Sequence, residues 1–170
     1  MSPSSPLRSH RFRDRRHTKY DFLDPILVVC PGCGGDARVV RVPHGPGHPL
    51  YPAVAPRRLI CRACALSRAW NSGCMVFRRG SGGPARDPYF GAPLRLQTRT
   101  RHGLLWAYNF EHLELVERYV RASLRERAPR HETGSRKTLV ASLPVWIKRG
   151  RNRDEVLRAV GRVRAASPNA

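Results

Sequence analysis

Four cysteines occur in two pairs whose spacing is typical of a metal site. The first pair reads CPGC and the second reads CRAC, with 27 residues between the pairs. A two-residue spacer lets both sulfurs of one tight turn point at the same ion. Four thiolates complete the tetrahedral shell of zinc and leave no open position, so the pattern predicts a structural site. The predicted ligands are Cys30, Cys33, Cys61 and Cys64.

Other chemistry is open to these cysteines. Iron in a rubredoxin-like site uses the same four ligands, and CPGC alone could be a thioredoxin-like redox pair. Ala65 replaces the glycine that a second rubredoxin-like knuckle carries, and the redox motif needs a βαβ context without a second pair. Paired cysteines also fit a metal in a reducing compartment better than a disulfide framework. We therefore expect one zinc ion.

Three further residues of ligand type lie near these pairs. Cys74 is interpreted as a small neutral thiol, which is the ordinary state of an isolated cysteine. His44 and His48 lie in a loop rich in proline and glycine. Because four thiolates already fill the shell, we do not expect these three residues to bind the ion.

Short strands must position the two pairs. Apolar or alternating stretches flank each of them, at Ile26–Val29, Ala37–Val42, Arg57–Ile60 and Ala65–Trp70. Residues 21–80 are therefore predicted to form a zinc ribbon, a small antiparallel β-sheet with two CxxC knuckles. The ion would stabilise a module too small for a large apolar core. Residues 1–20 are predicted to be a disordered basic arm, and GSGGP at residues 80–84 marks a module boundary.

Residues 85–165 are predicted to form a helical extension, so the whole chain is assigned to the α+β class. A turn and short strand within 87–97 and a second strand at 104–108 form a β-hairpin. A long helix is predicted over 110–127, because Asn109 can cap it and its apolar residues share one face. Shorter helices are predicted at 144–149 and 154–165.

The charge balance points to a polyanionic partner. The chain carries 32 basic and 12 acidic residues, a net charge of +20, and such a surface attracts nucleic acid. A GC-rich genome would explain the preference for arginine over lysine, but not the scarcity of acids. We expect mainly phosphate contacts. The candidate residues are Arg57, Arg58, Arg62, Arg68, Arg149, Arg151 and Arg153.

Aromatic residues between the arginines could stack on bases, although core packing is the simpler expectation for each of them. They are Trp70, Phe77, Tyr89, Phe90, Trp106, Tyr108 and Trp146.

No catalytic constellation is evident in the sequence. Glu111, His112 and Glu114 resemble helix-borne metal ligands, but there is no HExxH pattern and no phosphate-binding loop. We expect neither an enzyme nor a small-molecule substrate. No stretch approaches the ~18 apolar residues of a membrane span, and the N-terminus lacks a secretory apolar region. The expected location is the cytoplasm.

Over about residues 17–165 the chain resembles bacterial, actinobacterial TFIIB-type zinc-ribbon-containing proteins. The resemblance rests on the blocks DPILVVCPGCGG, RRLICRACALSRAW, DPYFGAPLRLQ, LLWAYNFEHLELVERYVRASLRER and LPVWIKRGRNRDEVLRAV. It implies zinc at the four cysteines and no particular activity, because a shared fold does not carry function. The leading hypothesis is a nucleic-acid-binding accessory factor in transcription or replication. The alternative is a protein–protein interaction adaptor that docks on a nucleic-acid enzyme.

Overall fold

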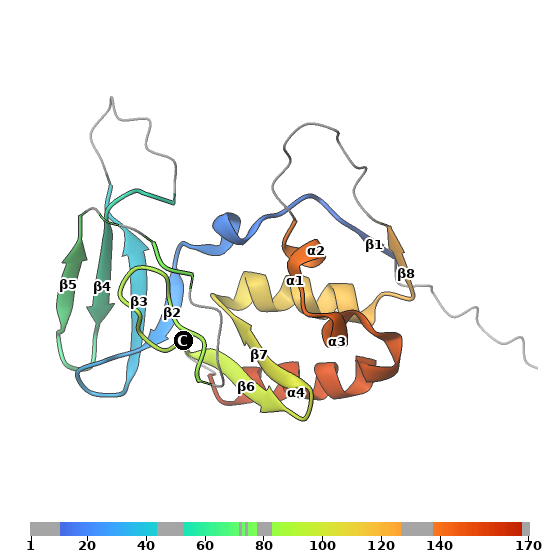
Figure 1. The fold of residues 1–170 in the computed structure, drawn as a ribbon. Coiled ribbons are helices and arrows are strands. Elements are labelled where there is room, and N and C mark those ends of the chain that lie inside the picture. Colours follow the sequence, from blue (N-terminus) through green and yellow to red (C-terminus); the bar gives the residue numbers. More distant parts are fainter. Residues whose placement is uncertain are drawn as a thin grey trace, which may run out of the picture.

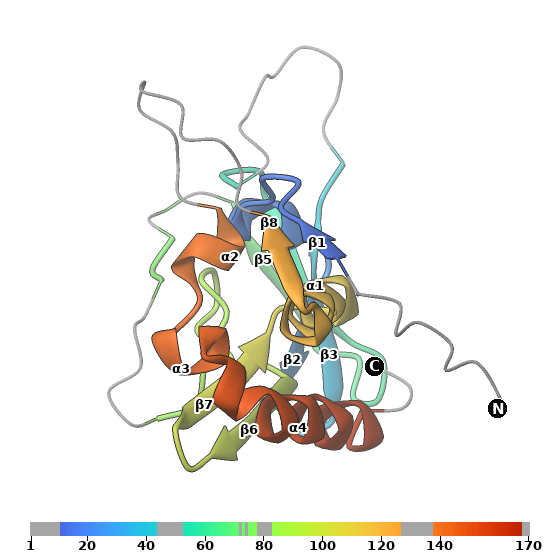
Figure 2. The same ribbon diagram turned by 90° about the vertical axis from the view of Figure 1, so that its right-hand side faces the viewer.

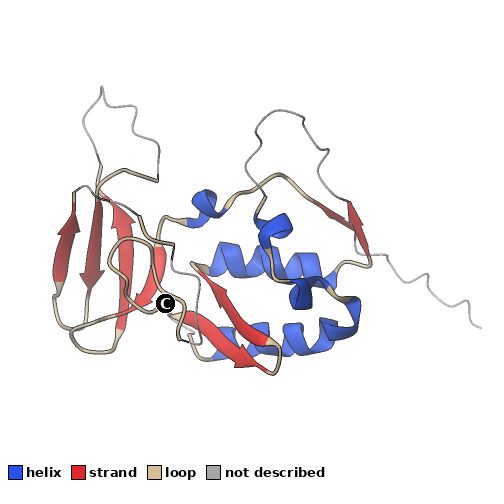
Figure 3. Cartoon of the chain, in the orientation of Figure 1, coloured by secondary structure: helices blue, strands red, loops and turns tan. Residues whose placement is uncertain are grey.

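The computed structural model describes residues 11–43, 53–71, 73, 75–77, 83–126 and 138–167. Within these residues the fold is mixed α and β. A four-stranded antiparallel sheet occupies one end, and a hairpin surrounded by helices occupies the other (Figures 1 and 3). None of the described helices has the length and apolar character needed to cross a membrane.

The four-stranded sheet is a meander in which each strand pairs with its neighbour in sequence. Its strands are β2 (Ile26–Val29), β3 (Asp36–Arg41), β4 (Arg57–Cys61) and β5 (Ser67–Trp70). Successive side chains of a strand point to opposite faces. In β4, Leu59 and Cys61 are therefore buried, whereas Arg58 and Ile60 are exposed. The strands expected around the cysteine pairs are all present.

The other end is built on the hairpin of β6 (Leu96–Thr100) and β7 (Gly103–Ala107). The helices α1 (Phe110–Arg121) and α4 (Arg153–Ala165) pack against this hairpin and against each other. Between them in sequence lie α2 (Leu139–Ser142), α3 (Val145–Lys148) and the 3-10 turn η2 (Gly150–Asn152). The predicted helices 144–149 and 154–165 correspond to α3 and α4, whereas α2 was not predicted.

Strand β2 connects the two ends of the molecule. Ile26 and Val28 point into the core beneath the four-stranded sheet, whereas Leu27 points into the core between the hairpin and the helices. The backbone of Leu27 also bonds to the hairpin end of the molecule. Its N–H donates to the Tyr108 carbonyl at 2.8 Å, and its carbonyl accepts from the Arg95 backbone N–H at 2.9 Å. Strand β2 of the predicted ribbon thus contributes side chains to both cores, so the predicted ribbon and the predicted extension pack together.

The prediction of a helix over 110–127 is wrong at its C-terminal end. The helix α1 ends at Arg121, because Ala122 has an extended conformation with ψ 131°. Two arginines satisfy carbonyls that the helix leaves open. Arg125 donates to the Val120 carbonyl at 3.3 Å, and Arg153 donates to the Ala122 carbonyl at 2.9 Å.

The prediction of a disordered arm over 1–20 is wrong for residues 11–20, and residues 1–10 lie outside the description. The strand β1 (Arg11–Arg13) pairs in parallel with β8 (Leu124–Glu126), and the two lie side by side in Figure 2. Phe12 is buried and packs edge-on against Tyr119, with ring centroids 5.3 Å apart. A 3-10 turn, η1 (Lys19–Phe22), follows.

Candidate metal centre

Each cysteine pair lies in a tight turn at the end of a strand. Cys30 follows β2 directly and Cys61 is the last residue of β4. The turns close through the backbone, because the Cys30 N–H donates to the Gly35 carbonyl at 2.7 Å and the Cys61 N–H donates to the Leu66 carbonyl at 2.9 Å. The strand pairing of β3 with β4 brings the two turns together.

Left-handed backbone shapes both turns. Gly34 has φ 73° in the first turn, and Ala65 has φ 57° at the equivalent place in the second. A side chain disfavours this conformation, at a cost of about 1–2 kcal/mol. The second turn therefore adopts the knuckle shape without the glycine that the first one has.

The four sulfur atoms form a compact group. All four lie within 4.8 Å of one another. The Sγ atoms of Cys30 and Cys64 are 3.7 Å apart, and those of Cys33 and Cys61 are 3.6 Å apart. Zn–S bonds of about 2.3 Å in a tetrahedron require sulfurs about 3.8 Å apart. None of these cysteines is in a disulfide, so the donor set fits one four-coordinate metal ion.

Neighbouring groups shift the pKa values of three of these thiols in different directions. Burial raises the pKa of Cys30, but backbone N–H groups of Cys33 and Gly32 and the adjacent thiols lower it to about 6. At Cys64 a backbone N–H lowers the pKa, but the Cys33 thiol and burial raise it to about 12. The pKa of Cys30 is therefore the lowered one, whereas those of Cys33 and Cys64 are raised. A bound cation would displace the thiol protons, because only thiolates are ligands.

Among the described residues, no other group of histidine, cysteine or carboxylate side chains could hold a metal. Glu111 and Glu114 face solvent at the start of α1, whereas His112 is buried. His112 accepts a hydrogen bond from the Tyr108 N–H, and burial lowers its pKa to about 3. The other ligand-type residues named from the sequence, Cys74, His44 and His48, lie outside the description.

The structure corrects one of the seven candidate phosphate-binding arginines. Arg57 is 1% exposed, because the pleat of β4 turns it inward. Its Nη1 donates to the Leu23 carbonyl at 2.8 Å, and its guanidinium lies over the Tyr89 ring. Arg57 therefore holds the sheet against the chain before β2 and cannot contact nucleic acid. Arg153 is half-buried and donates to the C-terminal end of α1.

The remaining five arginines are exposed but do not form one surface. Arg58, Arg62 and Arg68 lie on the hairpin of β4 and β5, and the segment 57–71 contains no acidic residue. Arg149 and Arg151 lie between α3 and α4, at the opposite end of the molecule in Figure 1. The five exposed candidate arginines thus form two separate groups.

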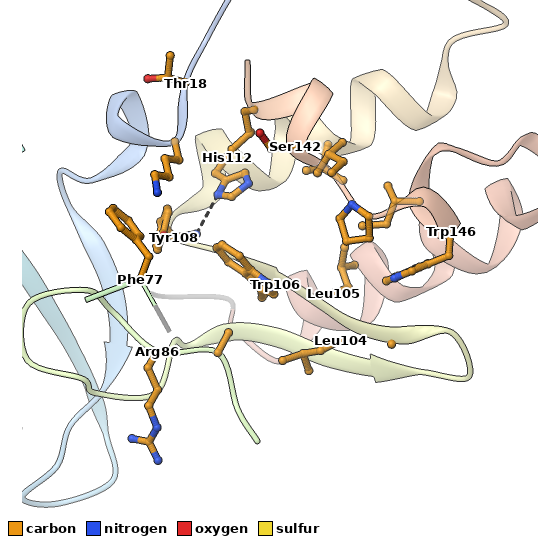
Figure 4. Close-up of a pocket in the computed structure, with 18 of the residues that line it drawn as sticks. Thr18, Phe77, Arg86, Leu104, Leu105, Trp106, Tyr108, His112, Ser142 and Trp146 are labelled. Atoms are coloured by element: carbon orange, nitrogen blue, oxygen red, sulfur yellow. Dashed lines mark hydrogen bonds between the residues drawn. The ribbon is translucent and has the colours of Figure 1, made fainter. Parts of the chain in front are cut away.

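A cavity of about 870 Å³ lies between η1, β7, α1 and the short helices α2 and α3 (Figure 4). Four of the aromatic residues named from the sequence line it: Phe77, Trp106, Tyr108 and Trp146. The sequence contained one further signal, because Leu104, Trp106 and Tyr108 alternate along a single strand. It did not indicate that Lys19 and His112 would meet them.

Comparison of the chain with protein-family models, curated proteins and solved structures finds no match.

Proposed function

We propose that the four cysteines hold one structural zinc ion in a zinc ribbon, and that the protein uses this platform to bind nucleic acid. The sulfur geometry supports a closed four-thiolate shell, because two of the sulfur–sulfur distances, 3.7 Å and 3.6 Å, match the edge of a zinc tetrahedron. Such a shell has no position for substrate, so the ion stabilises the sheet and performs no reaction. The same thiolates accept iron, and metal analysis distinguishes the two.

One surface supports the nucleic-acid part of the proposal. Arg58, Arg62 and Arg68 are exposed on the hairpin of β4 and β5, where the sequence supplies no carboxylate to pair with them. These guanidinium groups would displace cations condensed on the phosphates of the nucleic acid, and the released cations drive binding. The role we propose is that of a non-catalytic accessory factor in transcription or replication.

A salt titration tests this proposal. Binding of a labelled oligonucleotide is measured by fluorescence anisotropy between 50 and 200 mM salt, two concentrations over which phosphate-dominated affinity falls steeply. In Arg58→Gln and Arg68→Gln the slope of log K against log[salt] should decrease by about 0.7–0.9 per lost phosphate contact. Arg118→Gln is the matched control, because Arg118 is also exposed but lies on α1. A flat salt dependence, or equal effects of all three substitutions, would contradict the proposal.

A second candidate function rests on the apolar content of the same sheet face. Ile60 is 38% exposed between Arg58 and Arg62, and an apolar residue ringed by arginines also suits a protein partner. The ribbon would then be an adaptor docked on a nucleic-acid enzyme. A complex that survives nuclease treatment and is lost in Ile60→Ser favours this function.

A further inference from the structure

The cavity beside β7 has the size and walls of a ligand site. Its volume of about 870 Å³ lies within the range of about 300–1,000 Å³ that is usual for small-molecule sites. Figure 4 shows side chains from both sides of it, with Phe77, Tyr108 and Trp106 along one wall and Trp146 on another. These walls come from segments far apart in the sequence, so the packing of the whole domain holds them.

Aromatic rings dominate two of these walls. Leu104, Trp106 and Tyr108 share one face of the β7 segment, because Leu105 and Ala107 point into the core. Trp106 meets Tyr108 edge-on, with centroids 5.0 Å apart, and is only partly buried. An edge-on contact leaves ring surface on which another planar ring can stack.

The opposite wall depends on a glycine. Gly103 begins β7 with φ +147°, and a Cβ there would lie 3.1 Å from Nε1 of Trp146. The absence of a side chain lets the indole of α3 approach the hairpin closely. Trp146 is itself half-buried, so it borders the cavity instead of filling the core.

The polar groups of the cavity suit a ring with heteroatoms. His112 accepts from the Tyr108 N–H through Nδ1 at 3.2 Å, so in the neutral ring the proton is on Nε2, which is a donor. Thr18 and Ser142 also line the space, and their hydroxyls donate to the Asp21 carboxylate and the Thr138 carbonyl. An aliphatic chain would use none of these groups.

The charges at the cavity favour an anion over a cation. Lys19 and Arg99 line it, and no carboxylate does so among the described residues. The Lys19 Nζ lies 3.2 Å from the centroid of the Phe77 ring, which places a cation next to the aromatic wall. Arg86 also lines the cavity, but its guanidinium donates to the Gly91 carbonyl and points away in Figure 4. A cationic ligand in this aromatic setting would be repelled by Lys19.

We propose that this cavity binds one nucleotide unit, with the base stacked on the ring of Trp106 and the phosphate near Lys19. The inference rests on the proposed nucleic-acid function and specifies it, because only an unpaired base can enter such a site. A free nucleotide and a nucleotide within a single strand present the same chemistry, and the experiment separates them.

The test uses the full-length, zinc-loaded protein. Tryptophan fluorescence and calorimetry follow titration with the mononucleotides, with a 12-nucleotide single strand and with the matching duplex. Stacking on indole should quench fluorescence, and Trp106→Leu should weaken binding roughly 5- to 150-fold, the range for loss of one base–aromatic stack. Lys19→Gln, which removes no core side chain, should also weaken binding. Trp70→Phe is the control, because Trp70 packs on Tyr89 outside the cavity.

The outcomes distinguish a failure of the nucleotide site in the cavity from a failure of the proposed nucleic-acid function. Saturable mononucleotide binding identifies a free nucleotide as sufficient, and binding of the single strand alone identifies a nucleotide within a chain. Strand binding that depends on Arg58 but is unchanged in both Trp106→Leu and Lys19→Gln overturns the inference and leaves the proposed function standing. Mononucleotide binding without any strand binding supports the nucleotide site in the cavity and overturns the proposed nucleic-acid function. Tighter binding of a long-chain fatty acid than of any nucleotide would also overturn the inference.

Discussion

The backbone N–H of Tyr108 donates a 3.2 Å hydrogen bond to Nδ1 of His112, and both side chains are almost fully buried. This contact joins the end of the hairpin to the first turn of α1. Because the interior disfavours an imidazolium ion, burial lowers the pKa of His112 to about 3. The ring is therefore neutral in the folded protein and titrates normally once the chain unfolds.

Stability should consequently depend on pH through His112. Its pKa is lower in the folded state than the ordinary value of 6.5, so the unfolded chain binds the extra proton first. The contribution of the buried, neutral imidazole to the free energy of unfolding is complete above about pH 6.5 and is lost as the pH falls toward 3. Between pH 7.5 and 5.0 the loss should be about 2 kcal/mol. Urea denaturation of the wild type and of His112→Phe measures it. An equal pH dependence in the two proteins would contradict this assignment.

Substitution of the buried arginine should be far more damaging than substitution of its exposed neighbour. Arg57→Met removes the donor to the Leu23 carbonyl and the cation above the Tyr89 ring. We expect a loss of about 2–4 kcal/mol, because a buried acceptor is left without its charged partner. Arg58→Met, one residue along β4, should change stability by less than about 0.5 kcal/mol. Similar melting temperatures for the two variants would show that Arg57 is not structural.

The carboxylate of Glu117 should stabilise the packing of α1 on α4. It forms ion pairs with Arg121, one turn along α1, and with Arg164 of α4, each at 2.8 Å. Burial raises the pKa of Glu117, but the hydrogen bonds from both arginines outweigh it and lower the pKa. This contribution is therefore present above the ordinary glutamate pKa and is lost as the pH falls through the lowered value.

Glu117→Gln should cost about 1 kcal/mol at neutral pH, and the loss should shrink in 1 M salt. Glu114→Gln is the control, because Glu114 is exposed on the same helix and no ion pair to it is seen among the described residues. Denaturation curves at low and high salt measure both variants. A salt-independent difference between them would point to packing instead of charge.

The metal centre should release its ion when one buried thiolate is replaced. Elemental analysis of the purified protein should find about one zinc per chain, and Cys61→Ser should abolish it. Cys74→Ser should retain the ion, because Cys74 belongs to neither pair. A chelator should lower the melting temperature of the wild type and of Cys74→Ser alike. Iron in place of zinc, or a protein indifferent to both chelation and Cys61→Ser, would overturn the zinc assignment.

The features that the sequence predicts correctly are those with short-range causes. The CxxC spacing constrains each pair of sulfurs within one turn, and the alternation of β4 follows from the pleat of a single strand. The start of α1 follows from Asn109, whose side chain accepts from the His112 N–H at 2.9 Å. Each of these features depends on residues only a few positions apart, so the printed sequence is enough to locate them.

The end of α1 shows where local rules stop being sufficient. Its apolar periodicity continues to Leu124, but residues 124–126 pair with β1 instead, more than one hundred positions earlier in the chain. Helix periodicity contains no information about such a partner. Phe12 likewise lies in a polar stretch of the sequence, and only the folded structure shows that its ring packs against Tyr119.

By itself, therefore, the sequence determined that four cysteines could share one ion, where the strands around these cysteines and the main helix lie, and that the chain is strongly basic. Only the tertiary structure decided which arginines remain on that surface, because burial depends on what packs above a side chain. Arg57 and Arg58 are adjacent and identical in chemistry, yet one is enclosed by Leu23 and Tyr89 and the other faces solvent. The cavity has the same origin, since Lys19, Trp106, His112 and Trp146 meet only when four separate segments pack together.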